Sequence, residues 1–225
     1  MISVNFQFQR NILYTHDIYI RTIVPECLIE YFKLDFDIIE IDNAPEQFCK
    51  DFPIRTVPSV KLNDGSKIFE QIAVNDYLVR STGKEVEINK LLGSSDDLIR
   101  QTNIKSISSF SGSDLLNVLA SYVKPYIGMT SYEKTNEENA LKKLDVMYKF
   151  LEEKLTTAKY LTGNEITIAD LVTATSFKLG FAFMYGKEWR EEHKLLATWF
   201  DNVIHSKYLE FHFKDFKYPE VPKTL

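Results

Sequence analysis

The sequence from Asp51 to Val60 reads Asp-Phe-Pro-Ile-Arg-Thr-Val-Pro-Ser-Val, and Ile68 to Ala73 continue it as Ile-Phe-Glu-Gln-Ile-Ala. The Val57-Pro58 pair predicts a tight turn with extended backbone on either side. The second segment predicts the start of a helix whose first turn carries Glu70 and Gln71. A helix start offers free N–H groups and a partial positive charge, so this arrangement suits a small peptide-like anion. We therefore expect the functional site here.

The residues around this stretch alternate strand and helix patterns. Apolar residues at helical spacing follow a short strand, and Asn63-Asp64-Gly65 is a strong hairpin signal. The predicted order is βαβ, a short helix, a hairpin and a helix, which places the first two strands side by side and parallel. The strands are expected at 11–15, 36–41, 59–62 and 67–69, and the helices at 20–33, 45–51 and 70–81.

The periodicity fades between Gly83 and Gly93, which predicts a linker. Beyond it, helices are expected at 98–126, at 167–185 and at 195–204. The first of these is interrupted near Ser111-Gly112-Ser113. A further helix should present one stripe to a bundle core, formed by Leu141, Leu144, Tyr148, Leu151 and Leu155. The fold class is therefore α/β plus all-α, with an α/β domain at 1–82 and an all-α domain at 93–225.

Composition excludes several classes of function. The chain has 225 residues and a net charge of −5, which argues against direct binding of nucleic acid. Met1 to Arg10 lacks the apolar core of a secretory signal, and no apolar run could span a bilayer, so we expect a cytoplasmic protein. Cys27 and Cys49 are expected to be free thiols without a redox role. The histidines lack metal-ligand spacing, so no metal is expected; they are His16, His193, His205 and His212.

A second local signal lies at Thr167-Ile168-Ala169-Asp170. It fits a capping box, in which Thr167 caps the free N–H groups of a helix and Asp170 reaches back to the cap residue. Its expected role is structural.

Together, these signals resemble the glutathione transferase superfamily, whose members carry a Val-Pro turn with a cis proline, an acidic residue at the start of the third helix and a Ser/Thr-x-x-Asp capping box. The resemblance implies a thioredoxin-like N-terminal domain and an all-helical C-terminal domain. More specifically, the chain resembles the N-terminal, transferase-like module of the fungal translation elongation factor 1B gamma subunit. That subunit continues into a second folded domain, so we expect a stand-alone or truncated relative. The segments that carry this resemblance are Glu46-Gln47-Phe48, Lys50-Asp51-Phe52-Pro53, Leu91-Leu92-Gly93, Ser113-Asp114-Leu115, Ala169-Asp170-Leu171-Val172, Glu188-Trp189-Arg190, Trp199-Phe200 and Lys214-Asp215-Phe216-Lys217.

The resemblance implies a glutathione site at the opening stretch. Val57 would pair its backbone with the cysteine of glutathione, with Pro58 in cis. Glu70 would bind the ammonium group or cap the helix, and Gln71 would donate to the γ-glutamyl carboxylate. Gln71 stands where catalytic relatives have Ser. The alternative is a turn that maintains the fold and binds no ligand.

Conjugation requires a thiolate, and lowering a thiol pKa by about two units takes roughly 2.7 kcal/mol of preferential stabilisation. Family enzymes use Tyr or Ser between the first strand and the first helix, where this chain offers Tyr14, Thr15, Tyr19 and Arg21. We select Tyr14 and Arg21 as catalytic residues. The alternatives are a packed strand residue for Tyr14 and a surface ion pair for Arg21. Further aromatic residues would either line a pocket for the electrophile or pack in the helical core: Phe177, Phe181, Phe183, Tyr185 and Trp189.

Two functional hypotheses follow. In the first, the protein binds glutathione and conjugates it weakly to electrophiles. In the second, it is a non-catalytic interaction module that binds translation elongation factor subunits. The resemblance also implies a homodimer.

Overall fold

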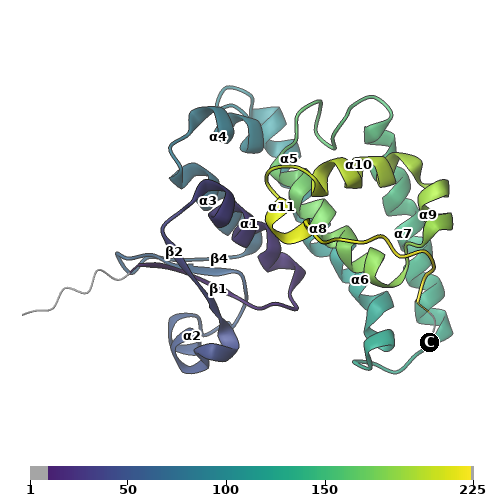
Figure 1. Cartoon of the computed structure of the whole chain (residues 1–225), viewed down its shortest axis with the longest axis horizontal. Coiled ribbons are helices and arrows are strands. Elements are labelled where there is room, and N and C mark those ends of the chain that lie inside the picture. Colours follow the sequence, from purple (N-terminus) through teal and green to yellow (C-terminus); the bar gives the residue numbers. More distant parts are fainter. Residues whose placement is uncertain (1–9, 224–225) are drawn as a thin grey trace, which may run out of the picture.

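The computed structural model describes residues 10–223, so most of the Met1 to Arg10 segment lies outside the described residues. A sheet with its flanking helices forms one half of the molecule, and a bundle of helices forms the other (Figure 1). The fold class expected from the sequence, a thioredoxin-like domain followed by an all-helical domain, is confirmed.

The sheet has four strands in the order β2-β1-β3-β4. β1 runs parallel to β2 and antiparallel to β3, and β3 pairs antiparallel with β4. The predicted βαβ unit and hairpin therefore both form. The strands are β1 (Asn11–Thr15), β2 (Phe36–Glu40), β3 (Ser59–Lys61) and β4 (Lys67–Phe69).

Alternation along β1 sends neighbouring side chains to opposite faces of the sheet. Leu13 belongs to the main core, whereas Tyr14 packs with Phe48 and Phe52 in a separate small cluster. Helices α1 (Ile23–Phe32) and α3 (Gln71–Ser81) cover the face of Leu13. Helix α2 (Pro45–Asp51) lies on the other side of the sheet (Figure 1) and covers the face of Tyr14.

The expectation of a linker from Gly83 to Gly93 is wrong, because helix α4 (Glu85–Leu92) occupies this segment. Both glycines have positive φ angles, of 64° and 87°, and they lie just outside the two ends of the helix. Leu91 and Leu92 are buried in the main core. A helix of only eight residues with a single buried turn gives too short a pattern to be recognised by periodicity.

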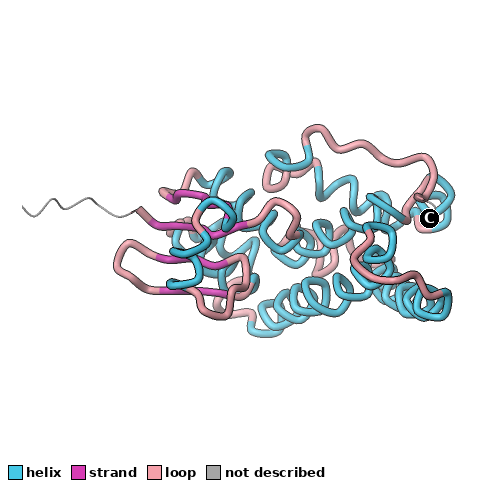
Figure 2. The backbone as a smooth tube through the Cα atoms, turned by 90° about the horizontal axis from the view of Figure 1, so that it is seen from below, coloured by secondary structure: helices cyan, strands magenta, loops and turns pink. Residues whose placement is uncertain are grey.

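The helical half begins with one nearly continuous helix. Its predicted interruption near Ser111 is a single π-helical segment, Ser111–Leu115, between α5 (Leu98–Phe110) and α6 (Leu116–Val123). A 3-10 turn then extends it (Lys124–Ile127). In Figure 2 the long helices run side by side along the molecule. The remaining helices are α7 (Lys134–Leu155), α8 (Ile168–Phe183), α9 (Lys187–Glu192), α10 (Lys194–Ile204) and α11 (Glu210–Phe213).

The predicted stripe on α7 needs one correction. Leu144, Tyr148, Leu151 and Leu155 are buried as expected, but Leu141 is 45% exposed. Ala140, four residues before Leu144, takes its place. The helical period selects position 140 because the bundle-facing stripe follows the i, i+4 spacing at this end.

The capping box at the start of α8 is confirmed. The buried carboxylate of Asp170 accepts hydrogen bonds from the backbone N–H of Thr167 and of Leu161, both at 2.9 Å. It also accepts one from the indole of Trp199 at 2.9 Å, which ties α10 to this corner. The structural role expected for this motif therefore holds.

Cys27 and Cys49 are both free, and Cys27 is buried. Among the residues that the structure describes, no helix combines the length and the apolar character needed to cross a bilayer.

Candidate functional site

A cavity of about 550 Å³ lies between the two halves of the molecule, at the edge of the sheet where the Val57-Pro58 turn meets the start of α3. It collects side chains from the turn, from the start of α3, from the segment before α1 and from the π-helical segment. The residues that line it are Tyr19, Arg21, Ile41, Arg55, Thr56, Val57, Glu70, Gln71, Ile72, Ser108, Ser109, Gly112 and Ser113. Four of the six predicted site residues are thus brought together, namely Arg21, Val57, Glu70 and Gln71, whereas Tyr14 and Pro58 do not line the cavity.

The turn supplies free backbone groups to this cavity. The Val57-Pro58 bond is cis, as the family resemblance implies, and Pro58 is buried behind Val57. Among residues 10–223, the N–H and C=O groups of Val57 have no hydrogen-bond partner. The hydroxyl of Ser59 donates to the carbonyl of Thr56 at 2.6 Å and holds the turn. A ligand with an extended backbone could therefore pair with Val57 in the manner of an added strand.

The start of α3 is open to the same cavity. Glu70 is the N-cap residue and makes no side-chain hydrogen bond to the helix, so the first N–H groups remain available to an anion. Glu70 has a positive φ of 72°, an unusual conformation for a residue other than glycine. Such strained residues are concentrated at ligand sites.

Gln71 and Arg21 join the two halves at the floor of the cavity. Gln71 is 6% exposed, and its side-chain amide donates to the backbone carbonyl of Arg21 at 3.1 Å. The guanidinium of Arg21 donates to the carbonyl of Gly112 at 2.9 Å and to Oδ1 of Asn117 at 3.3 Å. Arg21 is therefore bound across the domain junction, and within residues 10–223 it forms no ion pair.

Gly112 has a steric reason to lack a side chain. A Cβ atom at this position would lie 2.7 Å from Oε1 of Gln71. The π-helical segment thus brings its backbone directly against the start of α3, and π segments of this kind are frequent at functional sites.

Tyr14 does not line the cavity, and its selection as a catalytic residue is corrected by its position. Its side chain is 0% exposed and lies on the face of the sheet covered by α2. Its hydroxyl donates to Oδ2 of Asp51 at 3.0 Å. Burial and this hydrogen bond raise the pKa of Tyr14, so the phenol is held as a neutral structural donor. Thr15 is likewise engaged, because its hydroxyl donates to Glu26.

Asp51 anchors the start of the opening stretch. Burial alone would raise its pKa, but hydrogen bonds from Gln47, Lys61 and Tyr14 outweigh burial and lower the pKa to about 2. Oδ1 of Asp51 lies 2.9 Å from Nζ of Lys61 on β3. The carboxylate therefore fixes the end of α2 against the sheet.

Sequence reasoning did not recognise that Arg55 belongs to the same site as three serines, Ser108 and Ser109 at the end of α5 and Ser113 in the π-helical segment. Arg55 lies two positions before Val57 and has a positive φ of 59°. The sequence feature that could have identified Arg55 is a positively charged residue close to the Val57-Pro58 turn. By contrast, Phe177, Phe181 and Tyr185 are fully buried core residues and do not line the cavity.

Within the described residues, His16, Asp17 and Glu40 bring potential metal-ligating atoms within 4.8 Å of one another. Asp17 and His16 form a surface pair at 3.1 Å, and this group does not line the cavity.

Comparison with known proteins agrees with the observed fold. Residues 11–80 match the glutathione S-transferase N-terminal domain, and residues 117–207 match the glutathione S-transferase C-terminal domain. The chain belongs to the glutathione transferase superfamily. Within it, the chain is related to elongation factor 1-gamma.

Two relatives from Saccharomyces cerevisiae show this relationship. Elongation factor 1-gamma 1 is 36% identical over 203 residues, which are 90% of this chain and 49% of that protein. A putative elongation factor 1 gamma homolog is 32% identical over 88% of this chain and 89% of its own length. The chain therefore spans about half the length of the first relative and most of the second.

Solved structures give the same picture. The GST-like domain of elongation factor 1-gamma from Saccharomyces cerevisiae superposes with a TM-score of 0.87 at 35% identity, covering 96% of this chain and 98% of that one. The glutathione transferase URE2P6 from Phanerochaete chrysosporium, solved with oxidised glutathione, reaches 0.80 at 16% identity, covering 91% and 95%. The second likeness shows the shared fold.

Proposed function

We propose that this transferase-fold protein binds glutathione in the cavity between its two halves. The observation that carries the proposal is that Val57, Glu70 and Gln71 line one cavity together with two arginines. Glutathione has an ammonium group, two carboxylates and peptide groups. The cavity offers a matching group for each of them.

The expected pose follows from these groups. The free backbone of Val57 pairs with the cysteine of glutathione, and the carboxylate of Glu70 binds the ammonium group. The open N–H groups at the start of α3, with the amide of Gln71, bind the γ-glutamyl carboxylate. Arg55 is placed to attract the glycine carboxylate, because its guanidinium has no ion-pair partner within the described residues.

Conjugation, in this proposal, is weak. In the reaction, the thiol of glutathione loses its proton and the thiolate sulfur forms a bond to an electrophilic carbon of the second substrate. The electron pair displaced from that carbon leaves with a leaving group or takes up a proton. Tyr19 and Arg21 line the cavity and can stabilise the thiolate, whereas Tyr14 cannot reach it. The charge of Arg21 is shared with Gly112 and Asn117, which limits its effect on the sulfur.

Calorimetric titration with glutathione tests the proposal. Wild-type protein should bind in the micromolar to millimolar range, and the Glu70→Ala, Gln71→Ala double variant should lose this binding. Arg80→Ala is the matched control, because Arg80 is an exposed residue of the same helix whose side chain, among the described residues, bonds only to Asp76. No heat with the wild type, together with an unchanged Tm at high glutathione, would reject the glutathione site.

A second function is favoured by the relatives named as elongation factor 1-gamma. We propose as the alternative that the chain is a cytoplasmic, non-catalytic module that binds translation elongation factor subunits as a homodimer. Affinity purification from cell extract should then recover translation factors, including with the double variant that lacks glutathione binding. Sedimentation that shows only a single-chain species at micromolar concentration would refute the dimer.

A further inference from the structure

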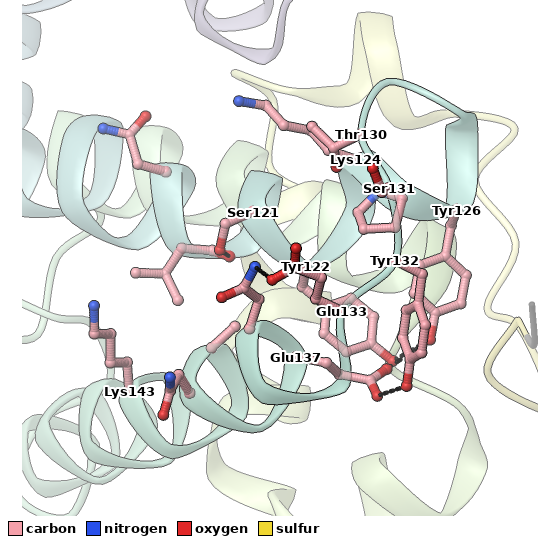
Figure 3. Close-up of a pocket in the computed structure, with 16 residues that line it drawn as sticks. Ser121, Tyr122, Lys124, Tyr126, Thr130, Ser131, Tyr132, Glu133, Glu137 and Lys143 are labelled. Carbon is pink, nitrogen blue, oxygen red and sulfur yellow. Dashed lines mark hydrogen bonds between the residues drawn. The ribbon is translucent and has the colours of Figure 1, made fainter.

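A second and larger cavity, of about 660 Å³, lies between α6 and α7 and is closed at one end by the loop that joins them (Figure 3). Its volume is within the usual range for small-molecule sites. None of its lining residues lines the first cavity. They are Asn117, Val118, Ser121, Tyr122, Lys124, Pro125, Tyr126, Thr130, Ser131, Tyr132, Glu133, Asn136, Glu137, Asn139, Ala140 and Lys143.

One end of this cavity is acidic and ordered by phenols. The two carboxylate oxygens of Glu137 accept hydrogen bonds from Tyr126 at 2.9 Å and Tyr132 at 2.8 Å (Figure 3). The ring of Tyr122 stacks on that of Tyr126 with centroids 5.1 Å apart. Glu133, beside them, accepts a hydrogen bond from Asn136 at 3.0 Å.

These two carboxylates have hydrogen bonds but no cation. Among residues 10–223, neither Glu133 nor Glu137 forms an ion pair, and each still has free acceptor positions. Hydrogen bonding to neutral phenols orients a carboxylate without neutralising its charge. This end of the cavity therefore suits a ligand ammonium group, which the faces of aromatic rings also attract.

The end of the cavity away from the tyrosines, and the wall opposite α7, carry positive charge. In Figure 3, Lys143 lies on α7 away from the tyrosines, and Lys124 lies on the opposite wall. Neither ammonium group has an ion-pair or hydrogen-bond partner in the part of the chain that the structure describes. Three side-chain amides also line the cavity and can pair with peptide N–H and C=O groups; they belong to Asn117, Asn136 and Asn139.

The positions of two charged residues along α7 indicate the length of the ligand. Glu137 and Lys143 are six residues apart on one helix, which corresponds to a rise of about 9 Å. An extended peptide advances about 3.3–3.6 Å per residue, so this distance corresponds to two or three residues.

We propose that the cavity between α6 and α7 binds a short peptide with free termini, its ammonium group at Glu133 and Glu137 and its carboxylate at Lys143. The site needs no glutathione in the first cavity. The two cavities share only a wall, where Oδ1 of Asn117 accepts a hydrogen bond from Arg21.

The test uses four peptides, which are free trialanine and its N-acetylated, C-amidated and doubly blocked forms. Each is titrated into the protein at up to millimolar concentration. Free trialanine should bind, and blocking each terminus should weaken binding by about threefold, as expected for one partly exposed ion pair. Two variants identify which end binds which terminus. With Glu137→Gln the acetyl group should weaken binding less than it does in the wild type, because only Glu133 remains at that end, and with Lys143→Ala the amide should no longer weaken binding.

The matched controls are Glu138→Gln and Lys142→Ala, whose side chains are exposed neighbours on α7 that do not line the cavity. Both should keep wild-type affinity, as should the Glu70→Ala, Gln71→Ala double variant of the first cavity. Unfolding midpoints establish that each variant folds. Equal binding of free and fully blocked trialanine, equal losses in the controls, or no binding of free trialanine would each overturn the proposal.

Discussion

The carboxylate of Asp51 offers a quantitative test of how the opening stretch is held in place. It is 6% exposed and accepts hydrogen bonds from Tyr14, Gln47 and Lys61 at 3.0, 2.8 and 2.9 Å. Its pKa falls from the ordinary value of 3.8 to about 2. Each unit of pKa corresponds to about 1.4 kcal/mol, so ionised Asp51 contributes about 2 kcal/mol to the free energy of unfolding.

The sign of the pH dependence follows from this shift. A carboxyl whose pKa is lower in the folded state stabilises the protein above its unfolded pKa. That contribution is lost as the pH falls from about 4 through about 2, where the folded state also takes up the proton. The Asp51→Asn variant has no such proton to gain, so the difference between the two proteins should shrink over this window.

Urea unfolding of the wild type and of Asp51→Asn, from neutral pH down to the lowest pH at which both fold, measures this difference. We expect the variant to be less stable by about 2 kcal/mol near neutral pH, with convergence below pH 4. Glu46→Gln, an exposed change on the same helix, is the control and should alter stability by about 0.5 kcal/mol or less at any pH. A difference that stays constant with pH would refute the assignment of this stability to the ionised carboxylate.

Three further predictions address the other structural conclusions. Tyr14→Phe should lower the free energy of unfolding by about 1–2 kcal/mol, because it removes a buried hydrogen bond to Asp51. Its glutathione affinity in calorimetry should equal that of the wild type, and a selective loss of glutathione binding would restore Tyr14 to the site. Asp170→Ala should cost about 3–5 kcal/mol in chemical denaturation, since several buried donors lose their acceptor, and a cost below 1 kcal/mol would contradict this role. Gly93→Ala should lower the thermal midpoint, because φ is +87° and the new Cβ would lie 3.0 Å from Cγ of Gln101; an unchanged midpoint would show that the turn can relax.

Local patterns predicted most of the secondary structure because they depend on neighbouring residues. The spacing of apolar residues gave α1 and α8, Asn63-Asp64-Gly65 gave the hairpin, and Thr167 with Asp170 gave the start of α8. The short helix α4 was missed, since one buried turn between two glycines leaves no periodic signal.

The candidate site could be predicted only in part. The sequence located the Val57 turn and the start of α3, because one continuous stretch carries both. It could not show which face of the sheet Tyr14 occupies, because strand alternation fixes only that Tyr14 and Leu13 point in opposite directions. The packing of α2 against Phe48 and Phe52 decided that question and placed the phenol on Asp51.

By itself, then, the sequence determined the four strands, most of the helices, the family, and the segment in which the glutathione site is proposed. Only the tertiary structure decided how the two halves meet. Arg21, Gln71 and Gly112 are separated by up to 91 positions along the chain, yet they form one hydrogen-bonded junction. The cavity between α6 and α7 also depends on two helices that approach across a loop. Local sequence specifies hydrogen bonds between near neighbours, whereas contacts between distant segments are set by how all the buried faces pack together.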